Sequence, residues 1–182
     1  ALETNRMFFT PYLNGSAYNG SDTIKVGDKD LNLCMRINAD NANKYIEYQY
    51  VISPDSYMLD LNLNIVGLHE EIKENTNAKM QWFVDINALE RGRDWESNNT
   101  TVFMRLSDEE IENLNEMKEA DDYSTKGSAH WIAYKQQFFS SFLISKDTVI
   151  QDPTISLVKL DENEHPSTLK TFKSEFYLDF PE

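Results

Sequence analysis

The chain has 182 residues, of which 40% are hydrophobic and 12% aromatic, and its formal net charge is −14. This length fits a single domain, 1–182, that can bury a substantial core. The acidity disfavours binding to nucleic-acid phosphates and to anionic lipid headgroups, and we interpret it as a source of solubility. Cys34 is the single cysteine, so an intramolecular disulfide framework is excluded.

The N-terminal third predicts irregular structure followed by strands. Residues 13–22 contain Gly15 and Gly20 and are expected to form a loose connection. A short strand is expected over 23–26, and a longer one over 31–37, where apolar and polar residues alternate.

The clearest pattern lies over 45–66. Apolar residues recur at every second position over 45–52 and again over 57–66, which is typical of strands with one buried face. Pro54 and Asp55 lie between these runs and favour a turn. The segment therefore predicts an antiparallel hairpin.

The C-terminal two thirds predict further strands, one helix and two loops. The strands are expected over 80–88, 100–106, 154–160 and 172–180. A short surface helix is expected near 108–120, because Ser107 and Glu110 have the spacing of a capping box and the apolar stripe that follows is thin. Exposed loops are expected over 119–128 and 161–168.

Residues 129–144 form the run richest in large apolar side chains, with Lys135 as its only charge. Its rings are expected to lie in the core of the fold: Trp131, Tyr134, Phe138, Phe139 and Phe142. The spacing also fits one face of a helix, but aromatic residues favour two strands with a turn at 135–137. Many strands joined by short polar connections predict an all-β antiparallel sandwich.

No motif in the chain predicts a catalytic, cofactor or metal site. The run 28–32 resembles the start of a calcium loop, but Leu33 replaces the required glycine and Ala39 the bidentate glutamate. Gly15 and Gly20 have the spacing of a phosphate loop, but the lysine is missing. The histidines are far apart in the sequence, at positions 69, 130 and 165.

The run from Trp131 to Ile144 resembles a signature of the periplasmic domain of the YidC family of membrane protein insertases, in its Bacteroidetes form. Residues 45–66 are similar to a tyrosine-rich hairpin of the same family, and residues 80–106 and the acidic stretch after them follow in the expected order. The resemblance covers roughly residues 35–180.

This resemblance implies a β-super-sandwich, similar to sugar-mutarotase and carbohydrate-binding domains, on the periplasmic side of the bacterial inner membrane. It also implies a non-catalytic domain that assists insertion and folding of inner-membrane proteins, chaperone-like, in contact with Sec translocon components and nascent membrane proteins. The family's insertion groove lies in membrane helices, so the resemblance transfers no site residue, cofactor or metal to this chain.

The ends of the chain carry two further expectations. It begins at Ala1 without a methionine and has no run of roughly 20 apolar residues, so we expect a fragment of a longer protein that does not itself span the membrane. Family domains continue beyond both ends, and missing strands would leave open sheet edges. We therefore expect edge-to-edge self-association.

A sugar-binding or mutarotase-like enzyme on the same sandwich is the alternative function. Such an enzyme needs a general acid and a general base, usually His and Glu, in one cleft. The candidates are His130, beside the aromatic run, and His69, which precedes Glu70 and Glu71.

Overall fold

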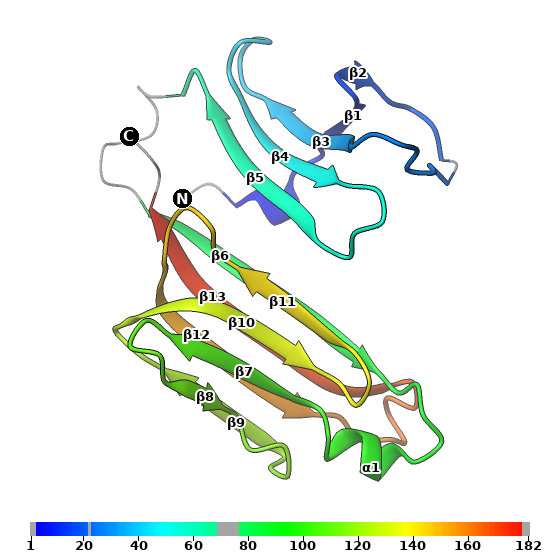
Figure 1. The fold of residues 1–182 in the computed structure, drawn as a ribbon, viewed down its shortest axis with the longest axis vertical. Coiled ribbons are helices and arrows are strands. Elements are labelled where there is room, and N and C mark those ends of the chain that lie inside the picture. The colour runs from blue at the N-terminus through cyan, green and yellow to red at the C-terminus, as the bar shows by residue number, and fades with distance from the viewer. Residues whose placement is uncertain (1–2, 22, 69–76, 180–182) are drawn as a thin grey trace. The chain divides into compact units, whose positions relative to one another are not determined.

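The computed structural model describes residues 3–21, 23–68 and 77–179, which form mainly antiparallel strands (Figure 1). The chain divides into two compact units, unit 1 over Ala1–Glu74 and unit 2 over Asn75–Glu182. The predicted all-β antiparallel architecture is confirmed. That both units belong to one domain over 1–182 stays a prediction.

Unit 1 is a five-stranded sheet in the order β2-β1-β3-β4-β5. A 3-10 turn, η1 (Thr4–Arg6), precedes the strands, which are β1 (Thr10–Leu13), β2 (Ser16–Ala17), β3 (Leu31–Asn38), β4 (Tyr45–Ile52) and β5 (Leu59–Val66). The predicted hairpin is confirmed, since β4 and β5 pair in continuous register from Tyr45↔Val66 to Ile52↔Leu59. This register places the apolar sets of both strands on the same face.

Of two predictions for the N-terminal region, the strand over 23–26 is wrong and the loose connection over 13–22 is wrong in part. Residues 18–21 do lack regular secondary structure, and residue 22 is outside the described residues. Residues 13–22 begin with a tight hairpin, because Asn14 (φ 48°) and Gly15 (φ 84°) adopt the left-handed conformations of a two-residue turn between β1 and β2. Residues 23–26 form no strand, because strand propensity is realised only where a neighbouring strand offers its backbone.

The opposite face of unit 1 is organised by polar contacts. The Arg36 guanidinium lies between the rings of Tyr12 and Tyr45, 4.7 and 4.0 Å from their centroids. Its Nε and Nη2 donate to Glu47 Oε2 over 2.9 and 2.6 Å. Glu47 is buried, so this charged pair compensates a carboxylate that has lost its water.

Unit 2 contains the remaining strands and the helix α1 (Arg93–Ser97). The strands are β6 (Asn77–Asn87), β7 (Thr101–Leu106), β8 (Ile111–Asn113), β9 (Ala120–Ser124), β10 (Ser128–Lys135), β11 (Ser140–Ile144), β12 (Ile150–Lys159) and β13 (Thr168–Asp179). The predicted strands over 80–88, 100–106, 154–160 and 172–180 are confirmed in β6, β7, β12 and β13, except that residue 180 is outside the described residues. The strand–turn–strand interpretation of 129–144 is also confirmed, by β10 and β11.

The strands of unit 2 form two layers that meet at a corner. One layer is β6-β13-β12-β9 and the other is β11-β10-β7-β8, and they are joined where the start of β10 pairs with the start of β12. Trp82 of β6 stacks on Tyr134 of β10 with ring centroids 3.9 Å apart. Three strand spacings of about 4.8 Å would separate β6 from β10 in a flat sheet, so the sheet must fold over.

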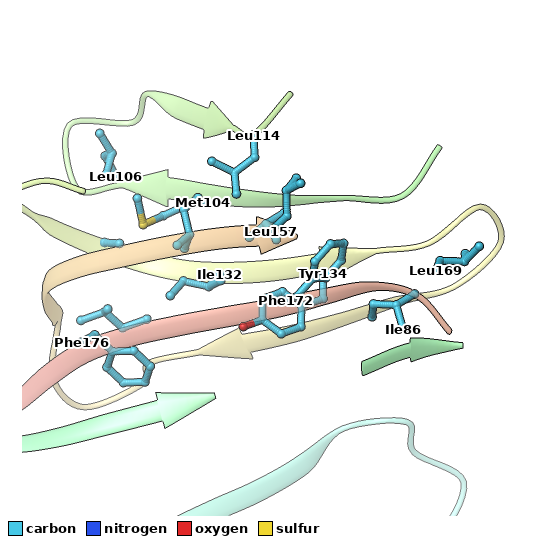
Figure 2. Close-up of a cluster of buried hydrophobic side chains, with 14 residues drawn as sticks. Ile86, Met104, Leu106, Leu114, Ile132, Tyr134, Leu157, Leu169, Phe172 and Phe176 are labelled. Carbon is cyan, nitrogen blue, oxygen red and sulfur yellow. The ribbon is translucent and has the colours of Figure 1, made fainter. Parts of the chain in front are cut away.

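The core of unit 2 fills the space between these layers (Figure 2). Alternate residues of β7, β10, β12 and β13 point inward, so that Val102, Ile132, Ile155 and Phe172 are fully buried. Leu114 completes the core from the connection that follows β8. At about 25 cal/mol per Å² of apolar surface, this burial is the main stabilising contribution to unit 2.

The helix predicted near 108–120 does not form, and the helix of unit 2 is α1 instead. Ser107 Oγ contacts Ser128 Oγ rather than capping a helix, and Glu109 has φ 76°, which no α-helix allows. β8 pairs with β7, and β9 lies where a loop was predicted over 119–128. Pairing at the sheet edge buries Leu114, which a surface helix with a thin apolar stripe would leave wetter.

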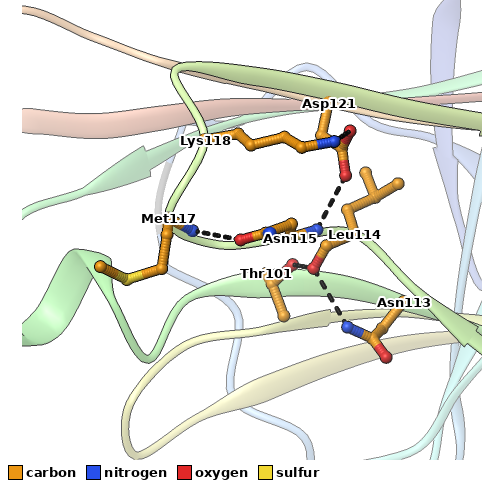
Figure 3. A network of polar contacts seen from close by, with 7 residues as sticks. All are labelled: Thr101, Asn113, Leu114, Asn115, Met117, Lys118 and Asp121. Carbon is orange, nitrogen blue, oxygen red and sulfur yellow. Dashed lines mark hydrogen bonds and ion pairs between the residues drawn. The ribbon is translucent and has the colours of Figure 1, made fainter.

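Local polar contacts hold the turn between β8 and β9 (Figure 3). Asp121 accepts from the backbone N–H of Asn115 over 2.8 Å and from Lys118 Nζ over 2.6 Å. Asn115 Oδ1 in turn accepts from the N–H of Met117 over 2.9 Å. Such side-chain acceptors compete with helix formation for the same backbone donors.

The predicted loop over 161–168 is confirmed as a connection of turns between β12 and β13. In the described part of the chain, β6 pairs only with β13 and β11 only with β10, so each has a free edge. Self-association through such edges stays a prediction.

Candidate functional site

The aromatic signature over 131–144 is divided between the core and the surface. Tyr134 is buried as predicted, and Trp131 is half-buried on the outer face of β10. The prediction is wrong for three rings, since Phe138, Phe139 and Phe142 are 68%, 69% and 55% exposed. Phe138 and Phe139 occupy the turn, while Phe142 pairs with Ala133 on the outer face, because alternate residues of a strand point to opposite sides.

Tyr134 is a structural residue of the core. Its hydroxyl donates to the carbonyl oxygen of Trp82 over 2.8 Å and lies 2.8 Å from Ser174 Oγ. Phe172 meets its ring edge-on at 5.2 Å. Burial raises the pKa of Tyr134 far above its usual range, so the hydroxyl stays protonated and offers no base.

A small open cavity of about 70 Å³ lies beside Tyr134. It is lined by Val84, Ile86, Tyr134, Gln136, Phe139, Ser140 and Ser141. Amide and hydroxyl groups provide its polar lining, and the tyrosine is its one titratable side chain. The lining therefore contains no acid–base pair of the kind that sugar mutarotation needs.

The described histidines do not converge on a carboxylate cleft. His130 lies near the start of β10, whereas His165 lies in the β12–β13 connection at the opposite end of the strands. His69 and its neighbours Glu70 and Glu71 are outside the described residues. Among the residues that are described, no three His, Cys, Asp or Glu side chains are placed to hold a metal ion. Cys34 is buried next to Glu47, and burial raises the pKa of its thiol.

One end of unit 2 gathers four connections between strands. Pairings Thr168↔Asn87, Lys159↔Lys170, Val158↔Ala120 and Lys135↔Thr101 place these strand termini together. The connections at this end are 88–100, 114–119, 136–139 and 160–167. We call this set of connections the four-loop end.

Three cationic side chains tie connection 88–100 to each of the others. Arg93 donates to four carbonyl oxygens in and around 160–167, the shortest being that of Thr168 at 2.6 Å. Lys135 Nζ donates to the carbonyl oxygen of Asn99 over 2.7 Å and so links the β10–β11 hairpin.

Lys170 makes the third link. Its Nζ is buried and donates to the carbonyl oxygens of Ser97, Thr100 and Glu116 over 2.7, 2.8 and 2.9 Å. Burial lowers the pKa of Lys170 to about 8, while three carbonyl oxygens suit the three donors of an ammonium group. These contacts make the four-loop end a preorganised structure rather than a set of independent loops.

The four-loop end carries the most exposed large apolar side chains among the described residues of unit 2. Leu89, Trp95, Met117, Phe138 and Phe139 are each more than 60% exposed. By contrast, the described connections at the opposite end, 107–110, 125–127 and 145–149, contain one large apolar residue, Val149. Sequence reasoning missed this grouping, because its members come from three connections that only the strand pairing brings together.

Comparison with known proteins identifies the family of the chain. The family model described as the YidC periplasmic domain matches residues 14–170. The chain belongs to the YidC periplasmic domain family. The membrane protein insertase YidC of Parabacteroides distasonis is 29% identical over 178 residues, which cover 97% of this chain and 26% of that protein.

Two further YidC relatives agree. The insertase of Bacteroides fragilis is 29% identical over 143 residues, covering 74% of this chain and 23% of its own length. The insertase of Porphyromonas gingivalis is 27% identical over 144 residues, which cover 79% of this chain and 21% of that protein. No solved structure matches the chain significantly.

The YidC match settles compartment and class. The chain spans about a quarter of the length of the curated YidC relatives it matches. Family membership places it on the periplasmic side of the inner membrane, as a domain of an insertase family rather than an enzyme. In the described parts of the chain, no helix is long and apolar enough to span a membrane. The region matched to YidC includes the whole four-loop end.

Proposed function

We propose that this chain is a non-catalytic interaction domain of a membrane protein insertase. In this proposal, the full protein helps to insert and fold inner-membrane proteins, alone or together with the Sec translocon, and the domain contacts translocon components and emerging substrate. The observation that carries the proposal is the YidC periplasmic match over residues 14–170.

The geometry supports a binding role over a chemical one. Tyr134, the titratable group at the open cavity, is held protonated by burial. The four-loop end, in contrast, exposes apolar side chains on a scaffold that is fixed by buried and half-buried cations. Exposed apolar residues on a preorganised surface are typical of protein contact sites.

The test uses the full-length insertase in cells that depend on it. Variants that lack residues 1–182, or that carry an unrelated domain in their place, are compared with the intact protein. We expect a lower yield of correctly inserted inner-membrane proteins, measured by protease protection, and a lower recovery of Sec components by co-purification. If both quantities are unchanged, the proposed interaction role is wrong.

A calorimetric titration separates this role from the sugar-binding alternative. The isolated chain is titrated with a panel of monosaccharides and oligosaccharides, and we expect no saturable heat. A saturable signal that Tyr134→Phe or Gln136→Ala removes would assign the cavity to a sugar and count against the proposal.

A further inference from the structure

We propose that the four-loop end is a docking surface for a polypeptide partner that presents apolar residues ringed by Lys and Arg. This inference rests on the proposed function and names the chemistry of the partner. Its evidence is the position of the exposed apolar residues, the rigidity of the connections that carry them, and the charge around them.

The apolar residues lie at one end of unit 2. Trp95 is 68% exposed on α1, and Phe138 and Phe139 in the β10–β11 turn are exposed to the same degree. Lys135 joins these two connections directly, through the carbonyl oxygen of Asn99. Aromatic side chains contribute a large apolar area at a low cost in conformational entropy, which is why they dominate binding hot spots.

The connections are fixed before any partner binds. Glu96 is buried in α1, and its carboxylate accepts from the backbone N–H groups of Leu89 and Glu90 at 3.1 Å. Together with Lys170 and Arg93, this contact satisfies backbone groups that would otherwise need water. A partner therefore does not have to order these loops, which reduces the entropy lost on binding.

Charge selects the partner. The four connections contain eight carboxylate residues and three basic ones. Arg93 is directed to backbone carbonyls, and Lys118 pairs with Asp121, so these two cations are occupied within the unit. The third basic residue, Arg91, is exposed beside Glu90, so carboxylates still outnumber exposed cations at this end. Around them stand exposed carboxylates: Glu90, Asp94, Asp161, Glu162 and Glu164. An acidic rim attracts Lys and Arg on a partner and repels anionic phospholipid, so a polypeptide fits better than a bilayer surface.

In the experiment, the full 182-residue chain is titrated with a short amphipathic peptide of leucine and lysine, and calorimetry measures the heat of binding. We expect saturable binding that weakens about tenfold or more in the triple variant Trp95→Ser, Phe138→Ser, Phe139→Ser. The matched control is Phe83→Ser, Ile111→Ser, Phe142→Ser, which removes apolar residues elsewhere on unit 2 that are more than half exposed, and it should bind like the wild type. Circular dichroism and thermal unfolding verify that both variants fold.

Two further arms test the charge argument. Glu162→Lys with Glu164→Lys should weaken binding, and added salt should do the same; a peptide with glutamate in place of lysine should not bind.

Equal binding by the Trp95 triple variant and its control would overturn the proposal. Sedimentation of the chain with phosphatidylethanolamine–phosphatidylglycerol vesicles, lost in the Trp95 triple variant, would assign the surface to lipid and also overturn it.

Failure here is distinguishable from failure of the proposed function. If the Trp95 triple variant binds normally, but deletion of the domain still lowers insertion or Sec co-purification, the interaction domain remains and uses another surface. If deletion has no effect in cells, the role itself is wrong, whatever the peptide does.

Discussion

Units 1 and 2 are both antiparallel and have similar alternating strands, yet they bury very different amounts of apolar surface. Fourteen buried residues form one cluster in unit 2. In unit 1, the buried apolar residues among those described are Cys34, Ile46 and Leu68. The difference follows from topology, because the sheet of unit 2 folds over at the β10–β12 corner and becomes its own second layer.

The single sheet of unit 1 depends more on polar contacts between strands. Besides the Arg36–Glu47 pair, Gln49 donates to Asn32 and accepts from Asn62, each over 3.3 Å. Such cross-strand pairs contribute only about 0.2–1 kcal/mol each. The comparison teaches that strands with the same alternating pattern do not bury the same amount of apolar surface. Unit 2 gains its larger buried core because its sheet supplies a second apolar layer.

The largest effect is expected for Tyr134→Ala in unit 2. Loss of this buried ring should destabilise unit 2 by about 3–5 kcal/mol, and Tyr134→Phe by about 1–2 kcal/mol through the unpaired Trp82 carbonyl. All three tryptophans lie in unit 2, so urea unfolding followed by tryptophan fluorescence reports on this unit. Trp131→Ala is the control at a half-buried ring and should cost less; a greater loss than for Tyr134→Ala would contradict this assignment.

Lys170→Met should destabilise unit 2 by about 2–4 kcal/mol, because three buried or partly buried carbonyl oxygens lose their donor. The matched control is Lys159→Met, since Lys159 contacts the exposed Glu119 over 3.4 Å and such surface pairs contribute about 1 kcal/mol or less. Denaturant unfolding measures both. Equal effects would mean that Lys170 does not hold the four-loop end together.

Arg36→Met tests the polar face of unit 1 and should cost about 1–3 kcal/mol, because it leaves the Glu47 carboxylate buried without its partner. Amide hydrogen exchange over β3, β4 and β5 resolves this unit from unit 2. Arg6→Met, at an exposed ion pair with Glu3, is the control and should change exchange little. If Arg36→Met speeds exchange only in unit 2, the Arg36–Glu47 pair does not stabilise unit 1 as we expect.

The smallest effect concerns Glu175 on β13. The Gln81 amide and the Lys79 ammonium hold the pKa of Glu175 at about 2, below its ordinary 4.5. A lowered folded-state pKa gives stability that is complete above pH 4.5 and lost as the pH falls toward 2. Glu175→Gln should therefore be less stable than the wild type by about 1 kcal/mol at pH 7. A difference that persists unchanged at pH 2 would exclude the charge as its cause.

Local pattern determined much of the fold. Alternation over 31–37 and 45–66 predicted β3, β4 and β5, because a period of two is a property of the backbone and needs no knowledge of the partner strand. The signature at Trp131–Ile144 likewise pointed to the family that the comparison shows. Strand formation and a family signature are both properties of short segments, so the local sequence is enough to predict them.

Tertiary structure alone decided which of the aromatic residues are wet. Phe138 and Phe142 belong to the same aromatic run as Tyr134, but both are exposed. Phe138 lies in the β10–β11 turn, and Phe142 lies on the outer face of its strand. Residues Ile111–Asn113 likewise pair with the edge of β7 and form a strand in place of the predicted helix. The four-loop end exists only because strand pairing collects distant connections at one end, and no local pattern can specify a juxtaposition that depends on the whole topology.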